Sequence, residues 1–222
     1  MKVCALIPAY NEEHHIAEVV GALVSQGYAV LVVDDCSSDH TSARAGDAGA
    51  IVVRHDVNRG KGGALATGFA WLRDHGYDGA ICLDGDGQHD PLEIARFSST
   101  AMRTGADIIV GTRMLHAHDM PPVRRVTNWF MSLVLSSLAG QRLTDTQSGY
   151  RFIKVTAWDR LGLSTSRFDA ESEMLVRACR LGMIVREVPI RTIYGDETSH
   201  MRPVRDTLRW IRLVVRLSGH SH

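Results

Sequence analysis

The carboxylate pair in Asp84-Gly85-Asp86 is the clearest chemical signal in the sequence. Gln88 follows at the next alternate position, and Gly85 and Gly87 let the backbone turn tightly between the oxygen-bearing side chains. Such oxygens suit a hard cation, Mg²⁺ or Mn²⁺, whose remaining positions phosphate oxygens and water would fill. We therefore predict that Asp84, Asp86 and Gln88 bind a divalent metal, with a solvated Asp-Gly turn as the alternative.

Two further segments carry groups that suit a nucleotide. Asp34 and Asp35 can accept hydrogen bonds from a base or from ribose hydroxyls, although Ser38 or Asp39 just after them also suits a helix cap. The segment 58–63, Asn-Arg-Gly-Lys-Gly-Gly, can bring backbone N–H groups and Lys61 to a phosphate. Its spacing is not that of a Walker A motif, so this signal is weak when taken alone.

Several arginines could bind phosphate in the bidentate manner that a guanidinium allows. They occur in Gly111-Thr112-Arg113, in the pair Arg124-Arg125 and in Ser148-Gly149-Tyr150-Arg151. For any one of them, a simple surface charge is the alternative.

The first half of the chain predicts a parallel sheet covered by helices, because short β-branched runs alternate with helix-like segments. Strands are expected at 3–7, 29–33, 50–53, 80–83 and 108–110, and helices at 12–25, 41–48, 61–75 and 91–104. The polar motifs at 8–12, 34–35 and 84–86 each follow a strand. Open parallel sheets bind ligands at the carboxyl ends of their strands, so we expect these motifs to line one crevice.

The pattern changes after Gly111. Apolar residues between 126 and 138 recur at helical spacing, and a strand at 149–153 and a helix at 170–181 follow. A last helix places four arginines on one face: Arg205, Arg209, Arg212 and Arg216. This face fits either the solvated side of a core helix or a helix laid on an anionic membrane.

Composition narrows the class of protein. A chain of 222 residues without an evident linker predicts one α/β domain, with a nucleotide-binding half at 1–110, an acceptor half at 111–200 and an amphipathic helix at 201–222. A net charge of zero argues against nucleic-acid binding. The four scattered cysteines suggest neither a zinc cluster nor disulfides, and favour a reduced, cytoplasmic protein. Since we find no signal peptide and no spanning segment, we expect any membrane contact to be peripheral.

The sequence resembles the family 2 glycosyltransferases of GT-A fold, particularly the branch with dolichyl-phosphate mannose synthase and the polyprenyl-phosphate glucosyltransferases. The similarity covers nearly the whole chain and rests on seven ordered motifs: Ile7–Glu13, Val33–Asp39, Gly60–Leu65, Leu83–Pro91, Gly111–Arg113, Asp145–Arg151 and Glu187–Ile190. It implies an α/β fold with a mostly parallel central sheet.

The resemblance also implies roles for individual residues. Pro8, Tyr10, Glu12 and Asp35 would contact the nucleoside, and Arg113 a phosphate, while either Arg124 or Arg125 would match a second phosphate-binding arginine. We predict catalytic roles for Asp86, Arg113 and Asp145. The predicted substrate-binding set is Pro8, Ala9, Tyr10, Asn11, Glu12, Asp34, Asp35, Lys61, Asp84, Gln88, Arg124, Arg125, Ser148, Arg151 and Glu171.

The activity expected from this resemblance is inverting transfer of a hexose from a UDP- or GDP-sugar to undecaprenyl or dolichyl phosphate, at the inner face of the cytoplasmic membrane. A phosphate acceptor needs no general base, because its second pKa is about 6. A soluble or saccharide hydroxyl would need one, and Asp145 or Glu171 is the candidate, unless it anchors an arginine. A nucleotidyltransferase and an inactive binding module are less favoured alternatives. Association of several copies is left open.

Overall fold

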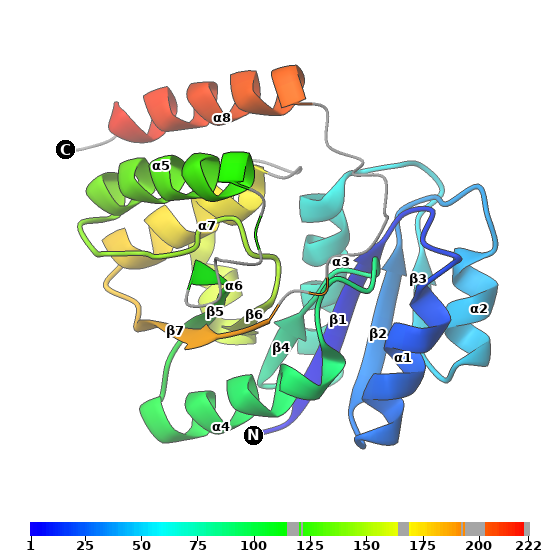
Figure 1. Cartoon of the computed structure of the whole chain (residues 1–222). Coiled ribbons are helices and arrows are strands. Elements are labelled where there is room, and N and C mark those ends of the chain that lie inside the picture. Colours follow the sequence, from blue (N-terminus) through cyan, green and yellow to red (C-terminus); the bar gives the residue numbers. More distant parts are fainter. Residues whose placement is uncertain (115–119, 121, 164–168, 192, 194–202, 220–222) are drawn as a thin grey trace.

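A central sheet organises the molecule, as the computed structural model shows (Figure 1). The structure describes residues 1–114, 120, 122–163, 169–191, 193 and 203–219; the side chains of 124, 169 and 203–209 lie outside the description. Seven strands are found in these residues, in the order β3-β2-β1-β4-β6-β5-β7. Their bounds are β1 Val3–Ala9, β2 Ala29–Asp34, β3 Ile51–Arg54, β4 Gly79–Cys82, β5 Ile108–Thr112, β6 Arg151–Lys154 and β7 Val185–Pro189.

Helices cover both faces of this sheet. Their bounds are α1 Ile16–Ser25, α2 Thr41–Asp47, α3 Lys61–Asp74, α4 Ile94–Thr104, α5 Pro122–Ala139, α6 Val155–Leu161, α7 Asp169–Arg180 and α8 Pro203–Ser218, and the 3₁₀ turn η1 Pro91–Glu93 precedes α4. Every strand and helix that we predicted is present, within a few residues at its ends. The prediction missed α6 and β7.

The sheet is mostly parallel, as predicted, with one exception. Strand β6 runs antiparallel to both of its neighbours, β4 and β5, whereas the other paired strands are parallel. The carboxyl ends of β1, β2, β4 and β5 therefore meet at one edge, and β6 begins at that same edge. The loop before β6 is thereby brought beside the ends of the parallel strands.

Alternate residues of the strands fill two hydrophobic cores, as the strand geometry requires. Leu6 of β1 packs with residues of α3, α5, α6, α7 and α8, while its neighbour Ile7 packs with residues of α1, α2 and α4. Helix α8 lies outermost, over α7 and α5 (Figure 1). Within the described residues, no helix combines the length and the apolar character that crossing a bilayer requires.

Candidate active site

Lys61, Asp84 and Glu171 meet at the carboxyl edge of the sheet, although they come from three different elements. Lys61 begins α3, Asp84 follows β4, and Glu171 lies in the first turn of α7. The Lys61 Nζ atom lies 2.5 Å from Asp84 Oδ1 and 2.9 Å from Glu171 Oε1. A mostly buried ammonium group thus joins the acidic motif to the second half of the chain.

The charges of this cluster stabilise one another. Burial raises the pKa of Asp84, but Lys61, His89 and Arg113 together lower it by more than burial raises it. The pKa of Asp84 is therefore below its ordinary value. Burial lowers the pKa of Lys61, but Asp84 and Glu171 raise it above its ordinary value. Both groups are therefore charged at neutral pH, and this edge of the sheet holds a fixed positive charge beside two carboxylates.

The turn before β6 closes on this cluster. A Cβ atom at Gly149 would lie 2.5 Å from Asp84 Oδ2 and 2.8 Å from Lys61 Nζ, so a side chain at 149 would displace one of them. Glycine is needed there for close approach of the backbone rather than for an unusual φ angle.

The predicted metal ligands offer oxygen donors but do not form a closed cage. The Gln88 backbone N–H donates to Asp86 Oδ1 at 3.0 Å, which keeps the two residues on one tight turn. No group of three His, Cys, Asp or Glu side chains arranged to hold a metal is found in the described residues. Two carboxylates and an amide therefore fit a hard cation that takes its other ligands from phosphate and water.

His89, which follows the predicted ligands, has a structural part in the site. Its Nδ1 accepts from the Asp84 backbone N–H at 3.2 Å, and its ring lies against the ring of Tyr150. Burial is the main cause that lowers the pKa of His89, to about 4, so the ring is neutral at physiological pH.

Arg113 and Asp145 form the second charged centre of the crevice. Arg113 Nε and Nη2 donate to the two oxygens of Asp145 at 2.7 and 2.9 Å, in the bidentate geometry that fixes a guanidinium. Asn128 of α5 donates to Asp145 Oδ1 at 3.1 Å, and the Gln147 N–H donates to the same oxygen at 3.2 Å.

These contacts argue against Asp145 as a general base. Burial raises the pKa of its carboxyl, but the hydrogen bond and charge of Arg113 lower it below the ordinary value. A fully buried carboxylate that already accepts from Arg113 and Asn128 is a poor acceptor for a substrate proton. The geometry favours the alternative that we left open, in which Asp145 anchors Arg113.

Arg151, which we predicted to bind substrate, is engaged within the protein, and a contact with substrate stays a prediction. Its side chain is 1% exposed and donates to the backbone carbonyls of Thr146, Ser148 and Glu171, at 2.9, 2.7 and 2.7 Å. The guanidinium therefore ties the turn before β6 to α7. Ser148 is also fully buried, and its Oγ has no hydrogen-bond partner among the described residues.

Asp34, which we also predicted to bind substrate, is engaged within the protein in the same way. It is fully buried, accepts from Ser42 Oγ and from the Ser37 N–H, and lies 3.4 Å from Arg54 Nη1. It braces the loop after β2 and presents no exposed oxygen to a nucleoside.

Asp35 is similarly engaged within the protein. Its Oδ1 lies 2.7 Å from His55 Nδ1 and accepts from the Arg59 N–H, while its Oδ2 accepts from the Gly60 N–H. It thereby connects the loop after β2 to the start of α3, where Lys61 lies. A nucleoside contact by Asp35 stays a prediction.

The loop after β1 docks on the loop after β2. Asn11 N donates to Ser37 Oγ and Glu12 N donates to Thr41 Oγ1, at 2.9 and 2.8 Å. Pro8 is partly buried and Ala9 is buried at the end of β1, whereas the Tyr10 ring is 44% exposed. The aromatic ring is therefore available to a ligand at this end of the crevice.

The remaining predicted arginines are not among the residues that make the contacts described above. Arg125 is exposed on the first turn of α5, and the side chains of Arg124, Arg205 and Arg209 lie outside the described part. Sequence reasoning missed Asn128, whose side chain donates to Asp145. The one signal for it was a polar residue within the apolar pattern of 126–138.

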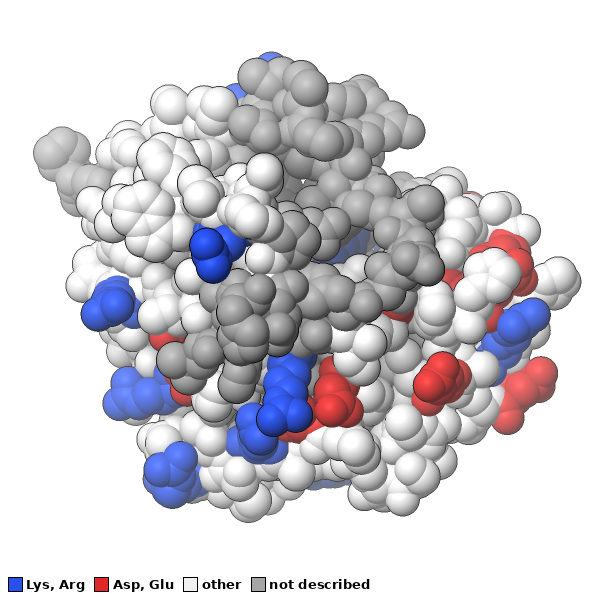
Figure 2. Space-filling view, in the orientation of Figure 1, with Lys and Arg blue, Asp and Glu red and all other residues white. Residues whose placement is uncertain are grey.

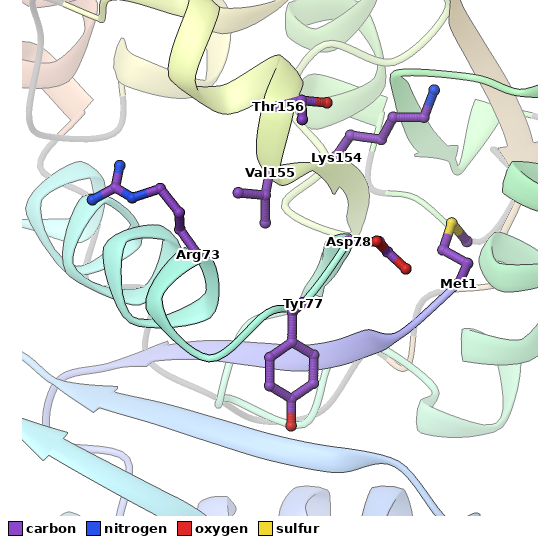
Figure 3. Close-up of a pocket in the computed structure, with 7 residues that line it drawn as sticks. All are labelled: Met1, Arg73, Tyr77, Asp78, Lys154, Val155 and Thr156. Atoms are coloured by element: carbon purple, nitrogen blue, oxygen red, sulfur yellow. The ribbon is translucent and has the colours of Figure 1, made fainter.

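A cavity of about 390 Å³ lies elsewhere, at the amino ends of β1 and β4 (Figure 3). Two of the cations that line it are already paired, Arg73 with Asp159 and Lys154 with Asp107. It shares no residue with the acidic motif, so we do not assign the active site to it. Its lining residues are Met1, Arg73, Tyr77, Asp78, Lys154, Val155 and Thr156.

The chain is similar in sequence to known proteins. A family model described as glycosyl transferase family 2 matches residues 4–161. The chain is 32% identical over 214 residues to a UDP-N-acetylglucosamine–dolichyl-phosphate N-acetylglucosaminyltransferase of Methanococcus voltae, covering 86% of this chain and 85% of the relative. It is 34% identical over 203 residues to an undecaprenyl-phosphate mannosyltransferase of Micrococcus luteus, covering 86% and 83%.

A solved structure shares the fold. Glucosyl-3-phosphoglycerate synthase from Mycobacterium tuberculosis, in complex with Mn²⁺, uridine diphosphate and phosphoglyceric acid, superposes with a TM-score of 0.73 at 20% identity, covering 97% of this chain and 76% of that one.

Proposed function

Because the chain belongs to glycosyl transferase family 2, we propose that it transfers a hexose from a UDP- or GDP-sugar to a polyprenyl phosphate, with inversion at the anomeric carbon. The family and its GT-A fold confirm the class of enzyme that the motifs predicted. The observation that carries the finer proposal is a pair of fixed cations at the carboxyl edge of the sheet, Lys61 and Arg113, beside an Asp145 carboxylate that Arg113 and Asn128 already engage.

The donor half of the proposal rests on Asp84, Asp86 and Gln88. These residues would hold Mg²⁺ or Mn²⁺, which supplies positive charge to the diphosphate as it leaves. Lys61 lies against Asp84 and can reach the same phosphates. The exposed Tyr10 ring suits the nucleoside end of the donor.

The acceptor half rests on Arg113, which Asp145 and Asn128 hold at the other side of the crevice. In the proposed step, a phosphate oxygen of the acceptor forms a bond to the anomeric carbon while the bond from that carbon to the diphosphate breaks. The acceptor phosphate is already ionised, so no proton has to be removed. The protein contributes alignment and a preorganised positive field.

The two relatives support a polyprenyl phosphate as acceptor, since both are named for transfer to such a lipid. A membrane-bound lipid acceptor and a nucleotide sugar made in the cytoplasm would place the protein peripherally at the inner face of the cytoplasmic membrane.

A soluble acceptor is the second candidate. Glucosyl-3-phosphoglycerate synthase shares the fold and was crystallised with phosphoglyceric acid. Phosphoglyceric acid would also bring a phosphate to Arg113. It would react through its hydroxyl group, however, and a base would have to remove the hydroxyl proton. The engaged state of Asp145 disfavours this candidate, while Glu171 beside Lys61 is the residue it would use.

The test is a transfer assay with purified protein, Mn²⁺ and a panel of radiolabelled UDP- and GDP-sugars. Undecaprenyl phosphate in detergent micelles and 3-phosphoglycerate serve as the competing acceptors. We expect label in the lipid, and loss of that label in Asp86→Asn but not in the exposed control Asp74→Asn. Label in phosphoglycerate with none in the lipid would overturn the proposed acceptor.

A further inference from the structure

In its first half, helix α5 presents apolar side chains to solvent and polar side chains to the protein. Val126, Trp129 and Leu133 lie on successive turns and are 62%, 57% and 54% exposed. Asn128 and Ser132, by contrast, are 4% and 3% exposed. A core-facing helix normally shows the opposite arrangement, so the exposed row calls for a partner outside the chain.

The neighbouring helix extends this apolar face. Ile211 and Val215 of α8 are 46% and 67% exposed, while Leu213 and Leu217 are buried beneath the helix. The rings of Phe130 and Trp210 lie 6.4 Å apart and connect the two helices. We call the exposed side of both helices the α5–α8 face; it comprises Val123, Arg125, Val126, Trp129, Phe130, Leu133, Ile211, Arg212, Val215 and Arg216.

The charge around this face has one predominant sign. Helices α5 and α8 contain six arginines and one aspartate, in a chain whose net charge is zero. Arg125, Arg212 and Arg216 are exposed beside the apolar row. In Figure 2 the surface in the area of α5 is mostly white with a blue patch just below it, and the larger red patches lie lower in the view and at the right.

We propose that the α5–α8 face docks on an anionic lipid bilayer. Apolar side chains flanked by arginines match an interface in which hydrocarbon lies beneath negative headgroups. A second copy of the chain, packed face to face by a two-fold axis, would set arginines against arginines, and like charges disfavour that arrangement.

The inner side of α5 ties this face to the crevice. Asn128 donates to Asp145, and Ser132 Oγ lies 3.2 Å from Thr146 Oγ1, so the same helix contacts the residues that hold Arg113. A helix with its side chains is about 10 Å across. Docking would therefore bring Arg113 within roughly one helix diameter of the bilayer surface, where a lipid phosphate lies. This point rests on the proposed function, whereas the docking itself does not.

The test is co-sedimentation of the full chain with vesicles of phosphatidylglycerol and phosphatidylcholine, compared with phosphatidylcholine alone. We expect binding to the anionic vesicles, weakened at least tenfold in Trp129→Ser/Leu133→Ser. The matched control is Met102→Ser, which removes an equally exposed apolar side chain from α4 and should leave binding unchanged. Arg212→Gln/Arg216→Gln should remove the preference for anionic lipid, unlike Arg103→Gln on α4.

Two further measurements separate the outcomes. Because the altered side chains are exposed, the melting temperature should stay that of the wild type, and transfer to a polyprenyl phosphate in micelles should persist. Equal vesicle binding by wild type and variants would overturn the proposal. So would a dimer in sedimentation velocity that Trp129→Ser/Leu133→Ser dissociates, because that result assigns the face to a second copy. Failure of transfer with intact vesicle binding would count against the proposed function alone.

Discussion

Lys61 holds two carboxylates that would otherwise repel each other. Its Nζ bridges Asp84 and Glu171 in a mostly buried site. Lys61→Met should lower the free energy of unfolding by about 3 kcal/mol, because removing one partner of a buried ion pair leaves uncompensated charge. It should also raise the pKa of Asp84, since the ammonium is the main cause that lowers it.

The same substitution tests the metal site. A divalent cation would replace the lost positive charge, so Mn²⁺ should raise the melting temperature of Lys61→Met more than that of the wild type. The control is Lys154→Met, which breaks the ion pair with Asp107 at the opposite edge of the sheet. An equal Mn²⁺ effect in both variants would show that the ion does not bind beside Asp84.

Asp145 makes the free energy of unfolding depend on pH in the acidic range. Its pKa is lower in the folded chain than in the unfolded chain, so its contribution is present above the unfolded value of about 3.9 and is lost as pH falls through the folded value. Asp145→Asn should cost about 2 kcal/mol at neutral pH. Urea unfolding between pH 6 and roughly pH 2.5 should then show a shallower acid loss than in the wild type. An unchanged slope would contradict this assignment.

At the scale of elements, the turn before β6 is the most constrained. Gly149→Ala would force a methyl group against Asp84 and Lys61. We expect it to abolish nucleotide binding and to cost about 1–3 kcal/mol through overpacking. Gly21→Ala is the matched control: its helix has space for a methyl group, and alanine there should stabilise by roughly 0.5–1 kcal/mol. Calorimetric titration with UDP and GDP, combined with thermal unfolding, reads out both effects.

The elements that sequence reasoning found are those with a continuous apolar run or with clearly marked ends. Strand β1 and helix α3 are long or uniformly apolar, and polar or glycine residues mark their limits. Strand β7 was missed because it is an edge strand: Val-Arg-Glu-Val-Pro carries two charges and ends in proline, which edge strands tolerate. Helix α6 begins at Val155, directly after β6 ends at Lys154, so no turn residue between them marks the start of a helix.

The sequence predicted which residues lie near the candidate site better than it predicted what each of them contacts. The motifs identified Asp84, Lys61 and Arg113, because strand ends in a parallel sheet share one edge. Residue type alone could not tell a carboxylate that faces a ligand from one that braces a loop, as Asp34 does. The same holds for Arg151, whose role depends on carbonyls that only the folded chain brings together.

At the scale of the whole molecule, the two halves that we predicted from the sequence are not separable. In the described part of the chain, the hydrogen-bonded neighbours of β5 are β6 and β7, both from the second half. A fragment of residues 1–114 should therefore lack a cooperative thermal transition and should bind ANS dye, because β4 has lost one neighbour and β5 both. A sharp transition in that fragment, matching the wild type, would contradict this prediction.

The antiparallel strand β6 also sets the order in which the chain can fold. During synthesis, β1 to β5 leave the ribosome before the strand that joins the fourth to the fifth. The early strands can pair as they emerge, but the backbone N–H and C=O groups of β5 stay unpaired until β6 arrives and inserts between β4 and β5. Asp145, which holds Arg113, lies in the loop that leads into β6, so the acceptor side of the site is assembled in the same late event that completes the sheet.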